Sequence, residues 1–247
     1  MIKDKIEKTA IIQKERNEMN LGNKPKRGMT IIAIVLLIVL SGCQKIDKQE
    51  DDIYIFFTSD VHCGVEDNLS LASLKALVDD TKAEHPYVSL VDLGDYLQGG
   101  TLGSLSKGKL IIELMNAMDY DVATFGNHEF DWGDDMFEKW EADGGFKFIA
   151  CNLIDKRTGK MPSWCKEYEL CYIGGHLVCI IGAATKDTVF TASKKRIENF
   201  DFLDPAKCIR KVLRKVEATY SPEAVVVLSH IGSHMNRLSG TPVSASN

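Results

Sequence analysis

Acidic, amide and imidazole side chains stand directly after four apolar segments of this 247-residue chain. The four sequences are Asp60-Val61-His62, Gly94-Asp95, Gly126-Asn127-His128-Glu129 and Ser229-His230. Oxygen and imidazole ligands of this kind suit a pair of divalent metal ions, and such a pair can assist the hydrolysis of a phosphate ester. Each sequence alone is common in turns. Their conjunction, each after an apolar run, predicts a dinuclear metal centre.

The spacing of the first two groups indicates how they share the ions. Asp60 and His62 are two residues apart, and in an extended backbone their side chains leave the same face, so both can reach one ion. Asp95 follows Gly94 in a tight turn, where its carboxylate can bridge two ions about 3.5–4 Å apart.

The last two groups supply the second ion and an acid or charge-stabilising group. Asn127 offers a carbonyl oxygen and His230 an imidazole. His128 need not be a ligand, because it can instead stabilise charge on a phosphoryl oxygen or protonate the leaving alkoxide.

Strands followed by helices must position these side chains. In an open α/β sheet, ligands bind beyond the carboxyl ends of the strands, so four strands side by side would gather the candidates in one crevice. Apolar runs predict those strands at residues 53–57, 87–93, 122–125 and 224–228. Further strands are predicted at residues 146–152, 169–173 and 176–183, the last two as a hairpin. Helices are predicted at residues 69–82, 109–118 and 134–141, and after Asp204-Pro205, which suit an N-cap and the first helical position.

Charge is spread unevenly along the chain. Residues 1–28 carry eight Lys/Arg and four Asp/Glu, whereas residues 44–247 carry 22 Lys/Arg and 31 Asp/Glu, a net charge of −9. Binding to a nucleic-acid polymer needs a basic stripe, so the acidic body argues against it. Affinity for phosphate would have to come from bound cations.

The N-terminus has the pattern of an export signal. A basic segment precedes an apolar run at residues 30–40, which is too short for the roughly 20 residues of a membrane-spanning helix. Leu40-Ser41-Gly42-Cys43 follows and resembles the bacterial lipobox. We therefore predict a signal peptide at 1–43, lipidation of Cys43, a polar tether at 44–52 and an exported protein anchored to a bacterial cell envelope. Residues 237–247 are predicted to be a disordered tail.

Six cysteines remain when Cys43 is set aside. Their pairing cannot be deduced from the sequence. Cys151 and Cys179 lie in apolar runs, and for these residues and for Cys63 a packing role is predicted.

The ordered motifs resemble those of the calcineurin-like metallophosphoesterases over roughly residues 52–234. The extensions Gln98-Gly99-Gly100 and Glu129-Phe130-Asp131 resemble the 5′-nucleotidase branch of that family. The resemblance implies a four-layer α/β/β/α sandwich over residues 53–236. It also implies hydrolysis of phosphate monoesters, most of all 5′-nucleotides, by a hydroxide held at two divalent ions, with zinc, manganese or iron as the metal. No protein partner is predicted.

Residue roles follow from the same resemblance. By motif position, Asp60 and His62 would hold the first metal, and Asp95 would bridge. Asn127 and His230 would hold the second metal. His128 would be the catalytic histidine, and it would be paired with Asp131.

The chain departs from the family pattern after His230. Family members continue to a Gly-His-x-His motif that supplies one more ligand to each metal, and 5′-nucleotidases add a C-terminal domain that holds the base. Neither follows in these 247 residues. We therefore expect a catalytic domain that is incomplete at its C-terminus. Two alternatives stay open: a phosphodiesterase or other small-phosphoester hydrolase using the same site, and an inactive surface lipoprotein fragment without a full metal site.

Overall fold

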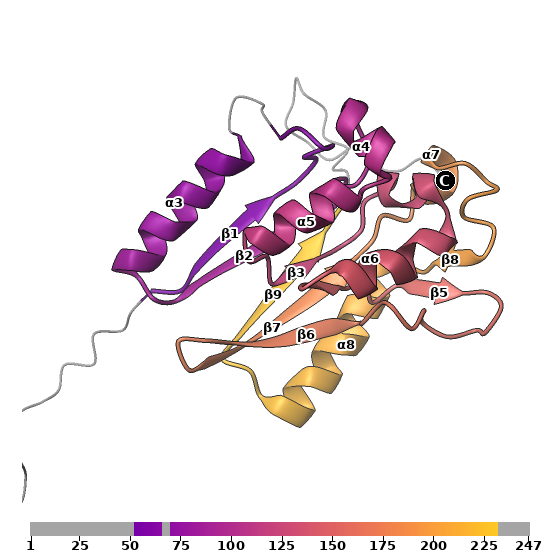
Figure 1. The fold of residues 1–247 in the computed structure, drawn as a ribbon. Helices are drawn as coiled ribbons and strands as arrows, with labels where there is room; N and C mark the ends of the chain where they lie inside the picture. Colours follow the sequence, from indigo (N-terminus) through magenta and orange to yellow (C-terminus); the bar gives the residue numbers. More distant parts are fainter. Residues whose placement is uncertain (1–51, 66–69, 232–247) are drawn as a thin grey trace, which may run out of the picture. The chain divides into compact units, whose positions relative to one another are not determined.

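The computed structural model describes residues 52–65 and 70–231 of the chain (Figure 1). The predicted signal peptide with Cys43, the tether up to residue 51 and the predicted tail at 237–247 lie outside these residues. Within the two described ranges, no helix has the length and apolar character needed to cross a membrane.

The first sheet contains four parallel strands in chain order: β1 (Tyr54–Thr58), β2 (Val88–Asp92), β3 (Val122–Ala123) and β4 (Lys147–Phe148). Parallel strands that are covered on both faces carry continuous apolar runs. Residues 89–92 of β2 are accordingly all buried. The predicted α/β fold with a parallel sheet is confirmed.

Helices cover one face of this first sheet. They are α3 (Leu71–Glu84), α4 (Gly100–Ser106), α5 (Lys109–Ala117), α6 (Phe137–Asp143) and the 3₁₀ turns η1 (His128–Trp132) and η2 (Asp134–Met136). Helix α3 starts where the Ser70 hydroxyl accepts a hydrogen bond from the amide of Ser73, which satisfies one of the free donors of the first turn. Helix α5 buries Ile111, Ile112 and Met115 on one face.

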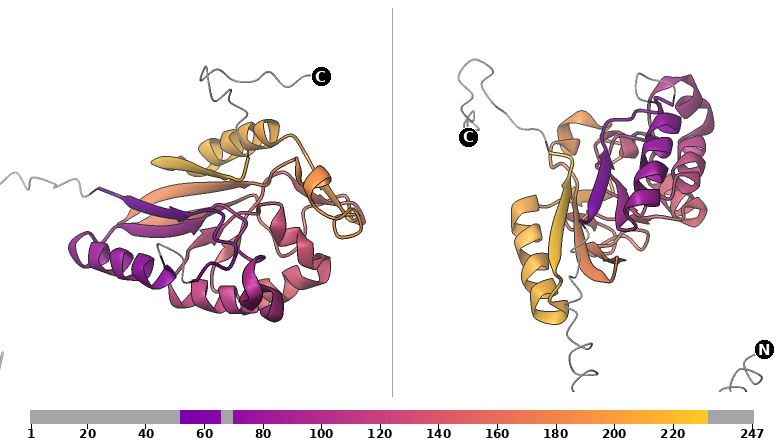
Figure 2. Two further views of the ribbon diagram at one scale, coloured as in Figure 1. Left: turned by 90° about the horizontal axis from the view of Figure 1, so that it is seen from above. Right: turned by 90° about the vertical axis from the view of Figure 1, so that its left-hand side faces the viewer.

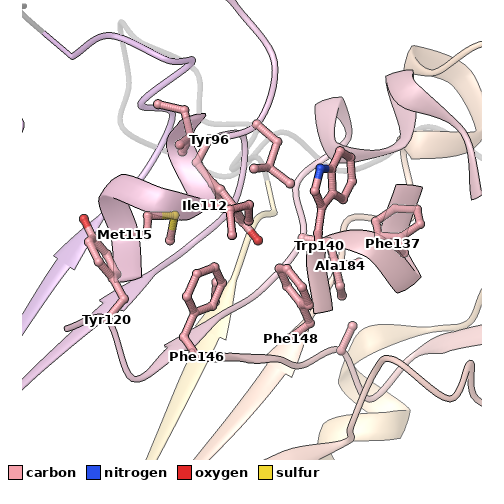
Figure 3. Packing of buried hydrophobic residues seen from close by; sticks show 14 of the residues in the cluster. Tyr96, Ile112, Met115, Tyr120, Phe137, Trp140, Phe146, Phe148 and Ala184 are labelled. Carbon is pink, nitrogen blue, oxygen red and sulfur yellow. The ribbon is translucent and has the colours of Figure 1, made fainter. Parts of the chain in front are cut away.

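An aromatic core lies under these helices. Figure 3 shows Ile112 and Met115 of α5 packed above Phe146 and Phe148, with Trp140 beside them. The ring of Phe137 stacks on Trp164 with centroids 4.2 Å apart. Trp140 is 1% and Trp164 8% exposed, so both belong to the core.

The second sheet has the order β6 (Tyr168–Ile173), β7 (His176–Ala183), β9 (Ala224–Ser229). Strands β6 and β7 form the predicted antiparallel hairpin, and β9 runs parallel to β7. Helix α8 (Pro205–Tyr220) makes the crossover between β7 and β9. Its predicted N-cap is confirmed, because the Asp204 side chain accepts a hydrogen bond from the amide of Lys207.

Two apolar clusters join the layers. Val91, Val122 and Ile149 of the first-sheet region pack against Val178, Ile180 and Leu228 of the second sheet. On the far face of the second sheet, Val212 and Val216 of α8 pack against Cys179 and Ile181. Figure 2 shows the resulting order, with α8 and α3 on opposite sides of the two sheets.

Two strand predictions are wrong. Strand β9 does not lie beside β1, β2 and β3 but belongs to the second sheet. The single strand predicted at 146–152 is broken: β4 ends at Phe148, and β5 (Leu153–Asp155) pairs with β8 (Phe200–Phe202) in a separate two-stranded sheet. The buried Asn152 side chain marks the break, because it bonds to the backbone of Ala184 and Leu203.

All six described cysteines are free thiols. Cys63, Cys151 and Cys179 are buried, which confirms their predicted packing role. Burial raises the pKa of the Cys63 thiol to about 11.

Candidate metal centre

The candidate residues lie where the strands of both sheets end. Strands β1, β2 and β3 are parallel, so their carboxyl ends meet at one edge of the first sheet. Figure 1 shows β9 of the second sheet pointing to the same edge. Because the two sheets pack face to face, the loop after β9 reaches the loops after β1 and β2 although the strands are not neighbours.

The loop after β1 is not extended. Strand β1 ends at Thr58, and Asp60, His62 and Cys63 have φ values of 56°, 46° and 58°. The premise that Asp60 and His62 leave an extended chain on one face is therefore wrong. The loop is held instead by the loop after β2, because the amide of Asp60 donates to the Gly94 carbonyl at 3.0 Å and that of His62 to the Asp95 carbonyl at 2.9 Å.

This left-handed loop still brings three ligand atoms together. Atoms of Asp60, His62 and Asp95 all lie within 4.8 Å of one another. His62 Nε2 is 3.8 Å from Asp60 Oδ1 and 3.8 Å from Asp95 Oδ2. His62 Nδ1 donates to the Gln98 carbonyl at 3.0 Å, which fixes the tautomer and leaves Nε2 as the free lone pair. Two carboxylates and one oriented imidazole fit a divalent cation.

His230 joins the cluster from the second sheet. Its Nε2 lies 3.2 Å from Asp95 Oδ2 and 3.9 Å from Asp60 Oδ1, while its Nδ1 donates to the Leu93 carbonyl at 3.1 Å. The hydrogen bond to Asp95 outweighs burial and raises the pKa of His230 to about 9. Burial would raise the pKa of Asp95, but bonds from His230 and from the His128 amide lower it overall.

Two glycines allow the Asp95 carboxylate to sit against the backbone. A Cβ on Gly126 would lie 2.0 Å from Asp95 Oδ1, and a Cβ on Gly94, whose φ is +109°, would lie 2.3 Å from the amide nitrogen of Gly126. Any side chain at either position would push the two loops apart. The glycines of the two motifs therefore have a steric role at the site.

His128 and Asp131 form a pair within the 3₁₀ turn η1. His128 Nδ1 lies 2.6 Å from Asp131 Oδ2, and the His128 and His62 ring centroids are 5.1 Å apart, edge to face. Burial lowers the pKa of His128, but the hydrogen bond to Asp131 and the charge of Asp95 raise it overall. Since Nδ1 is engaged by Asp131, Nε2 is the ring nitrogen left to exchange a proton with another group.

Asn127 is the candidate that the structure does not tie into the cluster. It is half-buried and directly precedes η1, between Gly126 and His128. Its side chain makes no hydrogen bond among the described residues. Its backbone position beside His128 is the one feature that places it near the other candidates.

Sequence reasoning missed two buried carboxylates that hold the loops. Glu129 is fully buried and accepts hydrogen bonds from four backbone amides. Burial and the charge of Asp95 raise the pKa of Glu129 overall, while the bonds from the amides of Asp95, Tyr96 and Leu97 act in the opposite direction. Asp92 is also buried, accepts from the Gly94 amide at 2.6 Å and from the Thr58 hydroxyl at 2.5 Å, and burial raises its pKa well above the ordinary value. An acidic residue inside an apolar run, as in Ser89-Leu90-Val91-Asp92, was the available signal.

Comparison with known proteins points in one direction. A family model of calcineurin-like phosphoesterases matches residues 53–245. A 5′-nucleotidase of Vibrio vulnificus is 27% identical over 219 residues, which are 83% of this chain and 39% of that protein. The human 5′-nucleotidase is 28% identical over 206 residues, 76% of this chain and 35% of that protein.

Solved structures agree in fold. The structure of a 5′-nucleotidase precursor from Thermus thermophilus superimposes with a TM-score of 0.65 at 26% identity, covering 73% of this chain and 37% of that one. A calcineurin-like phosphoesterase from Bacillus subtilis superimposes with a TM-score of 0.64 at 22% identity, covering 78% and 66%. The chain thus spans about two fifths of the length of the curated relatives that it matches.

Proposed function

Because the chain belongs to the calcineurin-like phosphoesterase family, we propose that it is a metal-dependent hydrolase of phosphate monoesters, with 5′-nucleotides as its substrates. The observation that carries the proposal is the convergence of Asp60, His62 and Asp95 at the ends of β1 and β2. The names of the relatives support the choice of 5′-nucleotides.

The geometry and the motif order support the following ligand roles. Asp60 and His62 would hold one ion. Asp95 would bridge, since its Oδ2 faces His62 on one side and His230 on the other. His230 and Asn127 would hold the second ion. When bound, zinc, manganese or iron ions would neutralise the phosphoryl oxygens and lower the pKa of the attacking water.

His128 would act on the ester itself. The Asp131 carboxylate holds Nδ1–H, so the imidazole presents Nε2 and its cationic form is stabilised. That form can stabilise charge on the phosphoryl group and can give a proton to the leaving alkoxide. Asp131 orients the ring and does not itself take part in proton transfer to the ester.

The wider organisation belongs to the same proposal. We propose that the described layers are part of the four-layer α/β/β/α sandwich of the family, with Gly-His-x-His ligands and a base-binding domain in a longer protein. We also propose that lipidation of Cys43 anchors the chain to a bacterial membrane from the outside. To test the anchor, the wild-type chain and Cys43→Ala are each expressed in a bacterial host that is supplied with a radioactive fatty acid. We expect label in the wild type and none in Cys43→Ala. A wild-type chain without label would contradict the anchor.

A substrate panel tests the function. The purified chain is mixed with Mn²⁺ or Zn²⁺ and offered 5′-AMP, a sugar phosphate and a phosphodiester. We expect phosphate release to be fastest from 5′-AMP. Faster turnover of the diester than of 5′-AMP would favour the alternative that the chain is a phosphodiesterase. No release from a chain shown by circular dichroism to be folded would favour the inactive fragment and contradict the proposal.

A further inference from the structure

The Glu129 carboxylate lies between two loops that carry metal-ligand candidates. Its Oε2 accepts from the amides of Asp95 at 2.9 Å and Gly126 at 2.8 Å. Its Oε1 accepts from the amides of Tyr96 at 2.8 Å and Leu97 at 3.1 Å. One side chain therefore joins the loop after β2 to the loop after β3.

The loop after β2 needs such a partner. Gly94 and Asp95 have φ values of +109° and +61°, so the chain leaves the strand conformation here. The amides of Asp95, Tyr96 and Leu97 then all point toward the Glu129 carboxylate. Successive amides that converge in this way form a concave site for an anion. Here the anion is the protein's own carboxylate, which is fully buried.

The same contacts fix the distance between candidate ligands. Oε2 is shared by the amides of Asp95 and Gly126, the residue before Asn127. Asp95 Oδ1 in turn accepts from the His128 amide at 2.9 Å, which closes a ring of bonds between the two loops. Each bond in the ring is made by a group that lies next to, or belongs to, a candidate of the metal centre.

We propose that Glu129 is a positioning residue that sets Asp95 against the Asn127-His128 segment and so determines the affinity of the centre for its metal. The proposal rests on the proposed function for the role of Asp95 as a ligand. Glu129 itself would touch neither metal nor ester, because both of its oxygens accept from backbone amides.

A carboxylate is required at this position for a geometric reason. Both oxygens of Glu129 only accept, and each receives two N–H groups. In Glu129→Gln an NH₂ group replaces one oxygen and faces two amide donors, so two buried N–H groups lose their acceptor while the volume of the side chain is unchanged. The affected loop should then move away from its partner.

The experiment compares Mn²⁺ affinity of the full chain, Glu129→Gln and a matched control by calorimetry. The control is Asn152→Asp, which disturbs another fully buried side chain, whose hydrogen bonds go to the backbone of Ala184 and Leu203. Loss of an outer group behind a metal ligand costs about 10–100-fold in affinity. We expect that loss in Glu129→Gln and wild-type affinity in Asn152→Asp. A folded Glu129→Gln chain with wild-type affinity, or an equal loss in the control, overturns the proposal.

A second measurement needs neither a variant nor a metal. Amide hydrogen exchange of the metal-free wild-type chain should show Asp95, Tyr96, Leu97 and Gly126 protected as strongly as the strand amides of β2. Exchange at the rate of open loops would overturn the proposal even if Glu129→Gln failed to fold. If the wild-type chain bound no Mn²⁺ while these four amides were protected, the proposed function would fail and the tie between the loops would stand.

Discussion

The ion pair between His230 and Asp95 makes a prediction about stability in the absence of metal. Asp95 Oδ2 lies 3.2 Å from His230 Nε2, and the two side chains are 5% and 15% exposed. The folded state therefore favours the protonated imidazole. Since its pKa is raised in the folded protein, this contribution is fully present below the ordinary pKa of 6.5 and is lost as the pH rises through about 9.

The size of the effect follows from the two pKa values. A group that titrates near 9 when folded and near 6.5 when unfolded contributes roughly 3 kcal/mol, at about 1.4 kcal/mol for each pH unit between them. The hydrogen bond with Asp95 is the largest cause, so the accompanying fall in the pKa of Asp95 describes the same interaction and is not added.

Urea unfolding of the chelator-treated chain between pH 6 and pH 9.5 measures this contribution. His230→Gln, which cannot take a proton, is unfolded in parallel so that other titrating groups cancel in the difference. We expect the advantage of the wild type over the variant to shrink by roughly 3 kcal/mol across this range. A difference that stays constant, or that disappears around pH 6.5, would refute the reasoning.

Two further predictions concern the contributions of other side chains to stability. The hydroxyl of Tyr96 is buried without a hydrogen-bond partner among the described residues. Tyr96→Phe should therefore leave the free energy of unfolding unchanged or raise it by about 1 kcal/mol. A clear loss of stability in urea unfolding would show that the hydroxyl has a partner. Asp204→Ala removes the N-cap of α8 and should lower the free energy of unfolding, whereas Asp204→Asn should keep most of the wild-type stability because asparagine also caps helices. Equal stability of all three chains in urea unfolding would contradict the capping role.

Local chemistry made part of the fold predictable. Asp204 and Pro205 predict the start of α8, and Gly174-Gly175 predicts the turn between β6 and β7. Both could be predicted because caps and turns depend on residues that are close in sequence. The break between β4 and β5 was missed because it depends on Asn152 reaching the backbone of distant residues. The sheet to which β9 belongs is likewise decided by long-range packing.

In the candidate site, too, the features that depend on local sequence were predictable and those that depend on long-range contacts were not. Motif order identified Asp60, His62 and Asp95, and the structure brings their ligand atoms together. The reason given for Asp60 and His62 was wrong, because the left-handed loop that positions them is held by bonds to a second loop. Glu129 was quoted as part of a motif, but its contacts to four amides depend on two loops 30 residues apart and could not be read from spacing alone.

The measurement that tests the central claim most directly is phosphate release from 5′-AMP by the wild-type chain and by Asp95→Asn, each with saturating Mn²⁺. Asparagine keeps the volume of the side chain but removes the charge that faces both His62 and His230. The account predicts release by the wild type and a loss of at least about 100-fold in Asp95→Asn, more than removal of an outer group would cause. Wild-type turnover in Asp95→Asn would contradict a metal centre built on this carboxylate.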